Sequence, residues 1–283
     1  MSNEQTVLIT GTSSGIGLAT AVAAAQAGWR AVATMRDTAK AGALLKAAEA
    51  AGVRELVEVR ALDVTDPASV EAALAGIVAD HGRLDAVINN AGAGHVGTIE
   101  QGTVADVRTV MEVNFFGVVE VTRAAMPLLR ESKGRLISVT SVGGVVGQPF
   151  NEAYCAAKFA VEGFMESLAP VAATTGVRVS VVEPGAVASE FVANIGVGPD
   201  VVAAAGPYGS AMASYLERVG TAFAAAQTSE GAAGAIIDLL TAEQPAFRVQ
   251  TSDAARAFTG VKLADQDGSA VQAMTGGWVG AKA

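Results

Sequence analysis

The chain has 283 residues, of which 51% are hydrophobic, and it carries a formal net charge of -9 at pH 7. This length suffices for one large α/β domain, and we expect a single domain over residues 1–283 because no Pro/Ser-rich linker or charge run divides the sequence. The acidic balance argues against a nucleic-acid partner, since phosphate binding needs clustered Lys and Arg.

Gly, Thr and charged residues interrupt the apolar sequence, so no stretch is long enough to span a bilayer. The N-terminus lacks the basic start and apolar core of a signal peptide. The lone cysteine, Cys155, has no partner for an intrachain disulfide, which agrees with a reducing compartment. We therefore expect a cytoplasmic protein without a membrane partner, and we expect no metal site.

Short β-branched runs alternate with longer Ala-rich stretches, a pattern typical of successive βαβ units around a parallel sheet. The predicted strands lie at residues 7–10, 31–35, 56–62, 86–89, 135–140, 177–183 and 247–250. The predicted helices lie at residues 18–27, 39–51, 67–80, 104–129, 152–174 and 229–239. The sequence thus predicts an α/β fold with a doubly wound, Rossmann-type parallel sheet of about seven strands and helices on both faces.

A glycine-rich segment at residues 10–17, Thr-Gly-Thr-Ser-Ser-Gly-Ile-Gly, follows the first strand and opens the first helix. Such glycines let the backbone approach a pyrophosphate, whose charge the helix N-terminus stabilises. The segment therefore predicts a dinucleotide site, to which we assign Gly11, Thr12, Ser13, Ser14, Gly15, Ile16 and Gly17. In a doubly wound sheet this site lies at the carboxyl ends of the strands.

Tyr154 and Lys158 are four residues apart in a predicted helix, so they share one face and the cation can reach the phenol. A fixed positive charge favours the phenolate, yet lowering a tyrosine pKa by ~3 units from ~10 needs about 4 kcal/mol. One partly screened lysine does not supply all of that, so we expect an oxidised, cationic nicotinamide to contribute the remainder.

Five motifs in order resemble those of the short-chain dehydrogenase/reductase family: the segment 10–17, Asn89-Asn90-Ala91-Gly92, Ser141, Tyr154-x-x-x-Lys158 and Pro184-Gly185. The resemblance covers residues 7 to about 191. Each motif alone arises readily by chance, but their joint order and spacing are specific. The family implies a nicotinamide-dependent oxidoreductase that acts on CH-OH groups.

The resemblance implies a catalytic set of Asn114, Ser141, Tyr154 and Lys158. Tyr154 would be the general acid in carbonyl reduction and the base in alcohol oxidation. Ser141 would bind the substrate oxygen, Lys158 would also hold the nicotinamide ribose, and Asn114 would support a proton path to solvent. The alternatives are a surface tyrosine beside a solvated lysine, a serine that caps a turn, and a buried amide that satisfies backbone groups.

The end of the second strand bears on cofactor choice, because an acid there binds the ribose hydroxyls and repels a 2′-phosphate. Met35 takes the usual acidic place and Arg36 follows, which favours NADP(H). Asp37 leaves NAD(H) possible, since it could pair with Arg36 or itself meet the ribose. The resemblance adds further cofactor contacts at Asp63, Val64, Asn90, Ala91, Gly92, Tyr154, Lys158, Pro184, Gly185, Val187 and Ser189. For Asp63 the alternative is a cap of the following turn.

Substrate contacts are expected from Ser141, Val142, Gly143, Gln148, Phe150 and Phe191, with His95 and Ile195 as further candidates. Most are uncharged, which favours an apolar ketone, aldehyde or secondary alcohol over a phosphorylated sugar. Residues 33–37 and 182–187 are similar to the steroid and retinol dehydrogenase-like branch. Residues 189–224 read as an apolar cover over the substrate, or alternatively as core or interface.

The tail, residues 251–283, carries no assigned motif, although Val261, Leu263 and Trp278 could anchor it to a neighbouring subunit. In relatives the helices at 104–129 and 152–174 form a dimer contact, so a homodimer or homotetramer is expected. Two competing functions stay open: a dinucleotide-sensing regulator or scaffold without catalysis, and an epimerase or dehydratase. The complete catalytic set argues against the first, and the short C-terminal part against the second.

Overall fold

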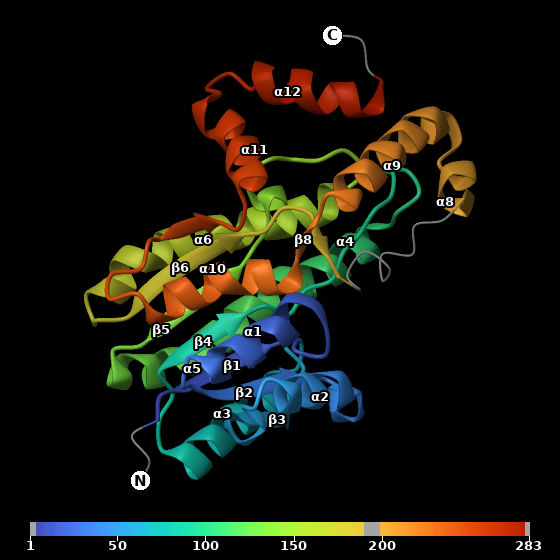
Figure 1. Cartoon of the computed structure of the whole chain (residues 1–283). Coiled ribbons are helices and arrows are strands. Elements are labelled where there is room, and N and C mark those ends of the chain that lie inside the picture. Colours follow the sequence, from blue (N-terminus) through green and yellow to red (C-terminus); the bar gives the residue numbers. More distant parts are fainter. Residues whose placement is uncertain (1–3, 190–198, 281–283) are drawn as a thin grey trace.

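A parallel sheet of seven strands forms the centre of the molecule, which is a computed structural model that describes residues 4–189 and 199–280 (Figure 1). The strand order is β3-β2-β1-β4-β5-β6-β9, so the order reverses between β1 and β4. The strands are β1 (Thr6–Thr10), β2 (Arg30–Met35), β3 (Val57–Ala61), β4 (Ala86–Asn89), β5 (Arg135–Val139), β6 (Arg178–Glu183) and β9 (Arg248–Gln250). All seven predicted strands are confirmed, and a short pair, β7 (Val187–Ala188) with β8 (Gln227–Thr228), is additional.

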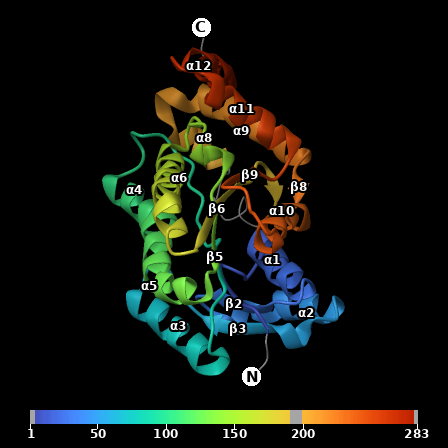
Figure 2. The same ribbon diagram turned by 90° about the vertical axis from the view of Figure 1, so that its left-hand side faces the viewer.

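Helices cover both faces of the sheet (Figure 2). One face packs against α1 (Gly15–Gln26), α2 (Gly42–Ala50) and α10 (Ser229–Thr241), and the other against α3 (Pro67–His81), α5 (Gly117–Ser132) and α6 (Glu152–Ala173). Alternate residues of β1 enter opposite cores, since Val7 and Ile9 join the first cluster and Leu8 joins the second. The Rossmann-type architecture predicted from the sequence is confirmed.

The predicted helix at 104–129 is interrupted. It comprises α4 (Val104–Met111), a π-helical turn at Glu112–Phe116 and α5. A π-turn inserts an extra residue into the helix and is frequent at functional sites. The periodicity of the sequence did not predict this π-turn. One inserted residue leaves the helical apolar pattern within α4 and within α5 nearly unchanged.

Four helices beyond residue 198 were not predicted: α8 (Pro199–Ala204), α9 (Gly209–Ala224), α11 (Asp253–Ala264) and α12 (Ser269–Gly276). Helices α9, α11 and α12 gather at the end of the molecule opposite the N-terminus (Figures 1 and 2). Trp278 stacks on Phe258 of its own chain at 5.6 Å, and its expected contact with a neighbouring subunit stays a prediction. Val261 packs into a cluster of its own chain, whereas Leu263 is exposed.

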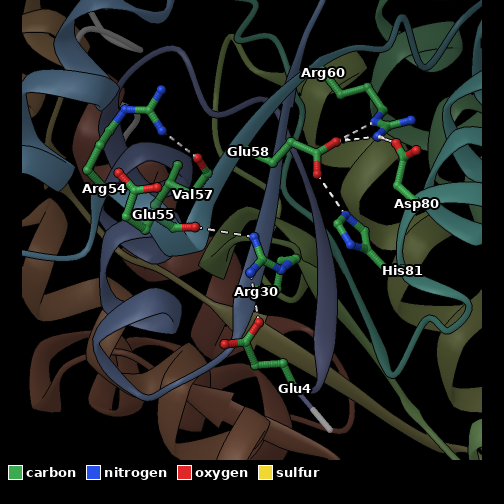
Figure 3. Close-up of polar contacts among 9 residues, drawn as sticks. All are labelled: Glu4, Arg30, Arg54, Glu55, Val57, Glu58, Arg60, Asp80 and His81. Carbon is green, nitrogen blue, oxygen red and sulfur yellow. Dashed lines mark hydrogen bonds and ion pairs between the residues drawn. The ribbon is translucent and has the colours of Figure 1, made fainter. Parts of the chain in front are cut away.

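The edge strand β3 is lined by charges (Figure 3). Glu58 pairs with Arg60 on the same strand and lies 2.7 Å from Nε2 of His81, while Arg60 reaches Asp80 at 2.6 Å. Charged side chains on an edge strand discourage pairing with another sheet. This network is remote from the cleft described below, and we assign it a structural role.

Within the described residues no helix is long and apolar enough to cross a membrane.

Candidate active site

A cleft of about 1280 Å³ runs along the carboxyl ends of the strands from the glycine-rich segment to α9 and the tail. Its position beside the reversal of strand order is where doubly wound sheets bind ligands. The cleft brings together most of the predicted site residues: Gly11, Ser13, Ser14, Gly15, Ile16, Gly17, Arg36, Asp63, Val64, Asn90, Ala91, Gly92, Ser141, Val142, Gln148, Tyr154, Lys158, Pro184, Gly185, Val187 and Ser189.

The glycine-rich segment forms a tight cradle at the start of α1. Gly11 has a φ of +71°, and a Cβ there would lie 2.7 Å from Cα of Ala91. A Cβ on Gly17 would overlap the carbonyl oxygen of Gly11 and the amide of Asn90. Ser14 is extended and its side chain does not cap the helix, so the first N–H groups of α1 remain available to an anion.

Hydrogen bonds join the cradle to β4. The hydroxyl of Thr10 accepts from the backbone N–H groups of Asn90 and Ala91, both at 3.0 Å. In return, the Asn90 amide donates to the carbonyls of Thr10 at 2.9 Å and Gly11 at 3.0 Å. These bonds hold the ends of β1 and β4 together where the strand order reverses.

Thr12 does not line the cleft. Its buried hydroxyl and its backbone N–H both donate to the carbonyl of Thr34, at 3.1 and 3.0 Å. The side chain therefore points toward β2 and holds the cradle against the sheet. We correct our expectation of a direct cofactor contact by this side chain, because its hydroxyl proton is donated to the Thr34 carbonyl and cannot also be donated to a cofactor.

At the end of β2, Arg36 is exposed and lines the cleft. Asp37 does not line it, and its carboxylate instead caps the next turn by accepting from the N–H of Ala39 at 3.0 Å. Partial burial acts to raise the pKa of Asp63, but hydrogen bonds from Thr65 and the nearby Arg36 outweigh it and lower that pKa. Asp63 thus caps the following turn, which was the alternative expected from the sequence, and it also lines the cleft.

Ser141, Tyr154 and Lys158 meet in the middle of the cleft. Ser141 lies two residues beyond β5 and hydrogen-bonds the Tyr154 hydroxyl, while its oxygen accepts from the N–H of Gly143 at 3.0 Å. Lys158 is 4% exposed; its Nζ donates to the Val139 carbonyl at 3.0 Å and lies 5.8 Å from the centroid of the Tyr154 ring. The helix spacing predicted from the sequence thus places the cation beside the phenol.

Burial dominates the protonation of this pair. It raises the pKa of Tyr154 to about 12, against the hydrogen bond with Ser141, and it lowers the pKa of Lys158 to about 8, against the attraction of Glu162. Without a nicotinamide, desolvation of the phenolate thus exceeds the effect of the Ser141 hydrogen bond, and Tyr154 keeps its proton at neutral pH. The lowered tyrosine pKa expected from the sequence included the charge of a bound oxidised nicotinamide, and it stays a prediction for that complex.

Asn114 lies in the π-turn and is fully buried outside the cleft lining. Its Nδ2 donates to the carbonyls of Ala93 at 2.9 Å and Val110 at 3.0 Å, and its Oδ1 accepts from the N–H of Ala93 at 3.1 Å. A Cβ on Gly92 would lie 2.9 Å from that oxygen and 3.6 Å from Nζ of Lys158. The amide therefore clamps the loop after β4 directly beside the lysine.

Part of the predicted substrate set does not line the cleft. Phe150 is 7% exposed, has a φ of +61° and packs edge-on against Tyr215 at 5.5 Å, so it supports the wall and we correct its assignment as a contact. Gly143 and His95 also lie outside the lining. Phe191 and Ile195 fall outside the described residues.

Sequence reasoning missed Asn151, Val96 and Phe258 of the cleft, whereas the other residues below belong to the segment 189–224 that it expected to cover the substrate. Asn151 donates to the Tyr215 hydroxyl at 2.6 Å, which joins α6 to α9 at the substrate end. Apolar residues complete this end: Val96, Val202, Leu216, Val219, Phe223 and Phe258. For the residues of this wall within 201–223, the sequence signal was the spacing of aromatic and aliphatic side chains. Met212 and Tyr215 of this segment are buried in a small cluster, so it both packs and lines the cleft.

A buried charge network behind Lys158 was also missed. Glu162, one turn further along α6, accepts from the Thr140 hydroxyl and pairs with Arg248 of β9 at 3.1 Å. Arg248 also pairs with Glu183 at 2.7 Å, although Glu183 is fully buried. Burial raises the pKa of both carboxyl groups despite these contacts. The 86-residue separation of Glu162 and Arg248 gave no local sequence signal.

Residues 5–199 match the family model described as short chain dehydrogenase. Estradiol 17-beta-dehydrogenase 1 of Rattus norvegicus is 37% identical over 95% of this chain and 80% of its own length. Retinol dehydrogenase 8 of Homo sapiens is 35% identical over 94% of this chain and 87% of its own. The crystal structure of a short-chain dehydrogenase from Streptomyces avermitilis has a TM-score of 0.76 at 30% identity, covering 98% and 97% of the two chains.

Proposed function

This chain belongs to the short-chain dehydrogenase family, and from that premise we propose that it transfers a hydride between NADP(H) and an apolar ketone, aldehyde or secondary alcohol. The observation that carries the proposal is the meeting of Ser141, Tyr154 and Lys158 in one cleft with the glycine cradle. A sensor that only binds a dinucleotide has no need of a buried proton donor beside a lysine.

The described residues fit a dinucleotide. The overlap at Gly11 and Gly17 shows that side chains are excluded from the cradle, and the open N-terminus of α1 suits a pyrophosphate. Arg36 would bind a 2′-phosphate, since it is exposed in the cleft while the competing carboxylate of Asp37 is engaged as a cap. Solved structures of the same fold include complexes with NAD and with NADP, so the fold does not decide between them, and we base the proposed NADP(H) preference on Arg36.

When bound, the nicotinamide supplies or accepts the hydride, and the protein supplies position and the proton. Ser141 would hold the substrate oxygen by hydrogen bonding, next to the Tyr154 hydroxyl. Tyr154 would give its proton to that oxygen in reduction and take it back in oxidation. Lys158 would place its cation beside the developing phenolate and bind the ribose, while Asn114 holds the loop that borders the lysine.

The substrate class is proposed from the cleft wall. Its far end is mostly aliphatic and aromatic, which suits an apolar body around the reacting oxygen. The names of the similar proteins, an estradiol dehydrogenase and a retinol dehydrogenase, fit such a substrate. Helix α9 supplies much of this wall, and we assign residues 189–224 to substrate covering within a single domain.

We also propose a homo-oligomer that uses α5 and α6. Phe116 at the start of α5 is 49% exposed, and Phe159 and Val171 of α6 are 40% and 64% exposed. Large apolar side chains on neighbouring helices favour contact with a second copy. Light scattering after size-exclusion chromatography should give a dimer or tetramer mass, and a monomer at micromolar concentration would contradict this assignment.

Calorimetric titration with NADPH and NADH tests the cofactor assignment, and turnover of apolar ketones by wild type and Tyr154→Phe tests the chemistry. We expect tighter NADPH binding, a loss of that preference in Arg36→Ser, and turnover in wild type that Tyr154→Phe loses while retaining NADPH affinity. Unchanged turnover in Tyr154→Phe would refute the proton-transfer role. Absence of binding by either nucleotide would refute the oxidoreductase proposal itself.

A further inference from the structure

Arg218 of α9 is a cation in the apolar part of the cleft. Of the described side chains that line the cleft, three are cationic: Arg36, Lys158 and Arg218. Arg36 lies beside Asp63 at the cofactor end, and Lys158 is committed to Val139 beside Tyr154. Arg218 therefore has no role in the proposed chemistry, although it shares its wall with Leu216, Val219 and Phe223.

Arg218 is exposed at the edge of the cleft, and an aromatic ring lies against its side chain. Its guanidinium carbon lies 4.5 Å from the Trp278 ring centroid, and Trp278 stacks on Phe258 at 5.6 Å with an interplanar angle of 22°. The stack thus joins α9 to the tail, whose short helical turn at Gly277–Val279 packs against α9. A guanidinium held by an aromatic face keeps the N–H groups at its edge for a ligand.

No carboxylate among the described residues occupies those N–H groups. The ion pairs and hydrogen bonds of residues 4–189 and 199–280 do not include the Arg218 guanidinium, although Arg60, Arg83, Arg123, Arg248 and Arg256 all have acidic partners there. A cation that lies on an aromatic ring, lines an apolar cleft and has no counterion among the described residues is suited to an anionic group on a ligand.

We propose that Arg218 binds a carboxylate at the end of the substrate remote from the reacting carbonyl or hydroxyl. This inference rests on the proposed function and narrows the substrate to an apolar carbonyl compound or alcohol that bears a carboxylate. A planar carboxylate matches the two-pronged edge of one guanidinium. A phosphate, with a charge near -2, would call for a second cation, which the described residues at this end of the cleft do not provide.

Binding without turnover tests the anion site directly. Decanoate and decanol share an alkyl chain but differ in charge, and each is titrated calorimetrically into the complex of the protein with NADPH. We expect decanoate to bind about 10-fold or more tightly than decanol in wild type, as for a charge-assisted hydrogen bond. In Arg218→Gln the two affinities should converge, and Arg218→Lys should retain part of the difference because it keeps the charge without the fork.

Arg256→Gln is the matched control, since Arg256 is an exposed arginine of α11 that does not line the cleft. It should leave the preference for decanoate intact. Thermal unfolding of each variant shows whether the fold is kept. Equal affinities for decanoate and decanol in wild type, or a preference that survives in Arg218→Gln, would overturn the proposal.

Turnover gives the second readout and separates this inference from the proposed function. Medium-chain ω-oxo carboxylic acids and their methyl esters are reduced with NADPH, and the acid-to-ester ratio of kcat/KM is compared. We expect a ratio of about 10 or more in wild type, carried mostly by KM, and a ratio near 1 in Arg218→Gln. Esters and acids reduced equally by wild type would refute the carboxylate site alone, whereas failure of wild type to reduce any apolar carbonyl would refute the proposed function.

Discussion

Replacing Arg248 with methionine should destabilise the protein by leaving two buried carboxylates without their cation. Glu183 is fully buried and Glu162 is 5% exposed, and Arg248 contacts them at 2.7 and 3.1 Å. Each carboxylate keeps one other hydrogen bond, from Gln250 and Thr140 respectively. Removing one partner from a buried ion pair typically costs 3–5 kcal/mol, and we expect a loss of about that size in the free energy of unfolding at pH 8.

The loss should shrink as the pH falls, because protonation removes the uncompensated charge. Burial already raises the folded-state pKa values of Glu162 and Glu183 above their usual range, and loss of Arg248 raises them further. For an acid whose folded pKa is raised, the folded state binds more protons than the unfolded state, so stability falls as pH rises between the unfolded pKa, about 4.3, and the folded pKa. Within that window the cost changes by up to about 1.4 kcal/mol per pH unit.

Urea unfolding followed by tryptophan fluorescence measures this effect in wild type and Arg248→Met at pH 8 and pH 5.5. Arg256→Met serves as the control, since this arginine is 66% exposed and pairs with an exposed aspartate. Exposed pairs contribute little, so the control should be near wild type at both pH values. A loss in Arg248→Met that is below about 1 kcal/mol at pH 8, or that is the same at pH 5.5, would refute the reasoning.

Further predictions concern the cradle, the lysine and the loop clamp. Gly17→Ala should weaken NADPH binding by at least about 10-fold, because the added methyl group would overlap the backbone of the cradle. In the control Gly234→Ala the methyl group enters open space, so this variant should bind NADPH normally. Equal calorimetric affinities of the two variants would contradict the role of Gly17. The kcat/KM for carbonyl reduction should fall as pH rises through about 8, because Lys158 loses its proton there while Tyr154 keeps its own. A flat profile from pH 6 to 9.5 would count against a role of the Lys158 charge in the reaction. Asn114→Leu leaves the polar groups of Ala93 unpaired and should lower the free energy of unfolding by about 1–3 kcal/mol, measured in urea; wild-type stability would show that the clamp is dispensable.

Much of the fold followed from local sequence. The β-branched runs predicted all seven strands of the central sheet. The five inner strands are mostly apolar segments because they are buried on both faces, whereas the partly buried edge strands β3 and β9 also carry polar and charged residues. The cradle followed from glycines placed between a strand and a helix, and the proximity of Tyr154 and Lys158 followed from one turn of helix. These features depend on residues close in the chain, where steric and periodic rules act directly.

The remaining features depended on contacts between residues far apart in the chain. Thr12 turned inward because a carbonyl of β2 lay beneath it, and Phe150 turned from the cleft to pack on Tyr215. The raised pKa of Tyr154 arose from burial by surrounding elements rather than from its helix neighbour. Such environments are set by the assembled core, so the motif alone did not predict the pKa of Tyr154 in the ligand-free protein.

The sequence by itself determined a seven-stranded doubly wound sheet, a dinucleotide cradle and the neighbouring Tyr154 and Lys158, since each depends on short-range patterns, while the place of Ser141 beside them followed from the family resemblance. Only the tertiary structure decided what surrounds them. It paired Arg248 with carboxylates 65 and 86 residues away, and it folded the tail so that the Trp278 ring lies against the Arg218 guanidinium. Charge pairing and aromatic stacking across such separations depend on how helices pack, which no local spacing encodes.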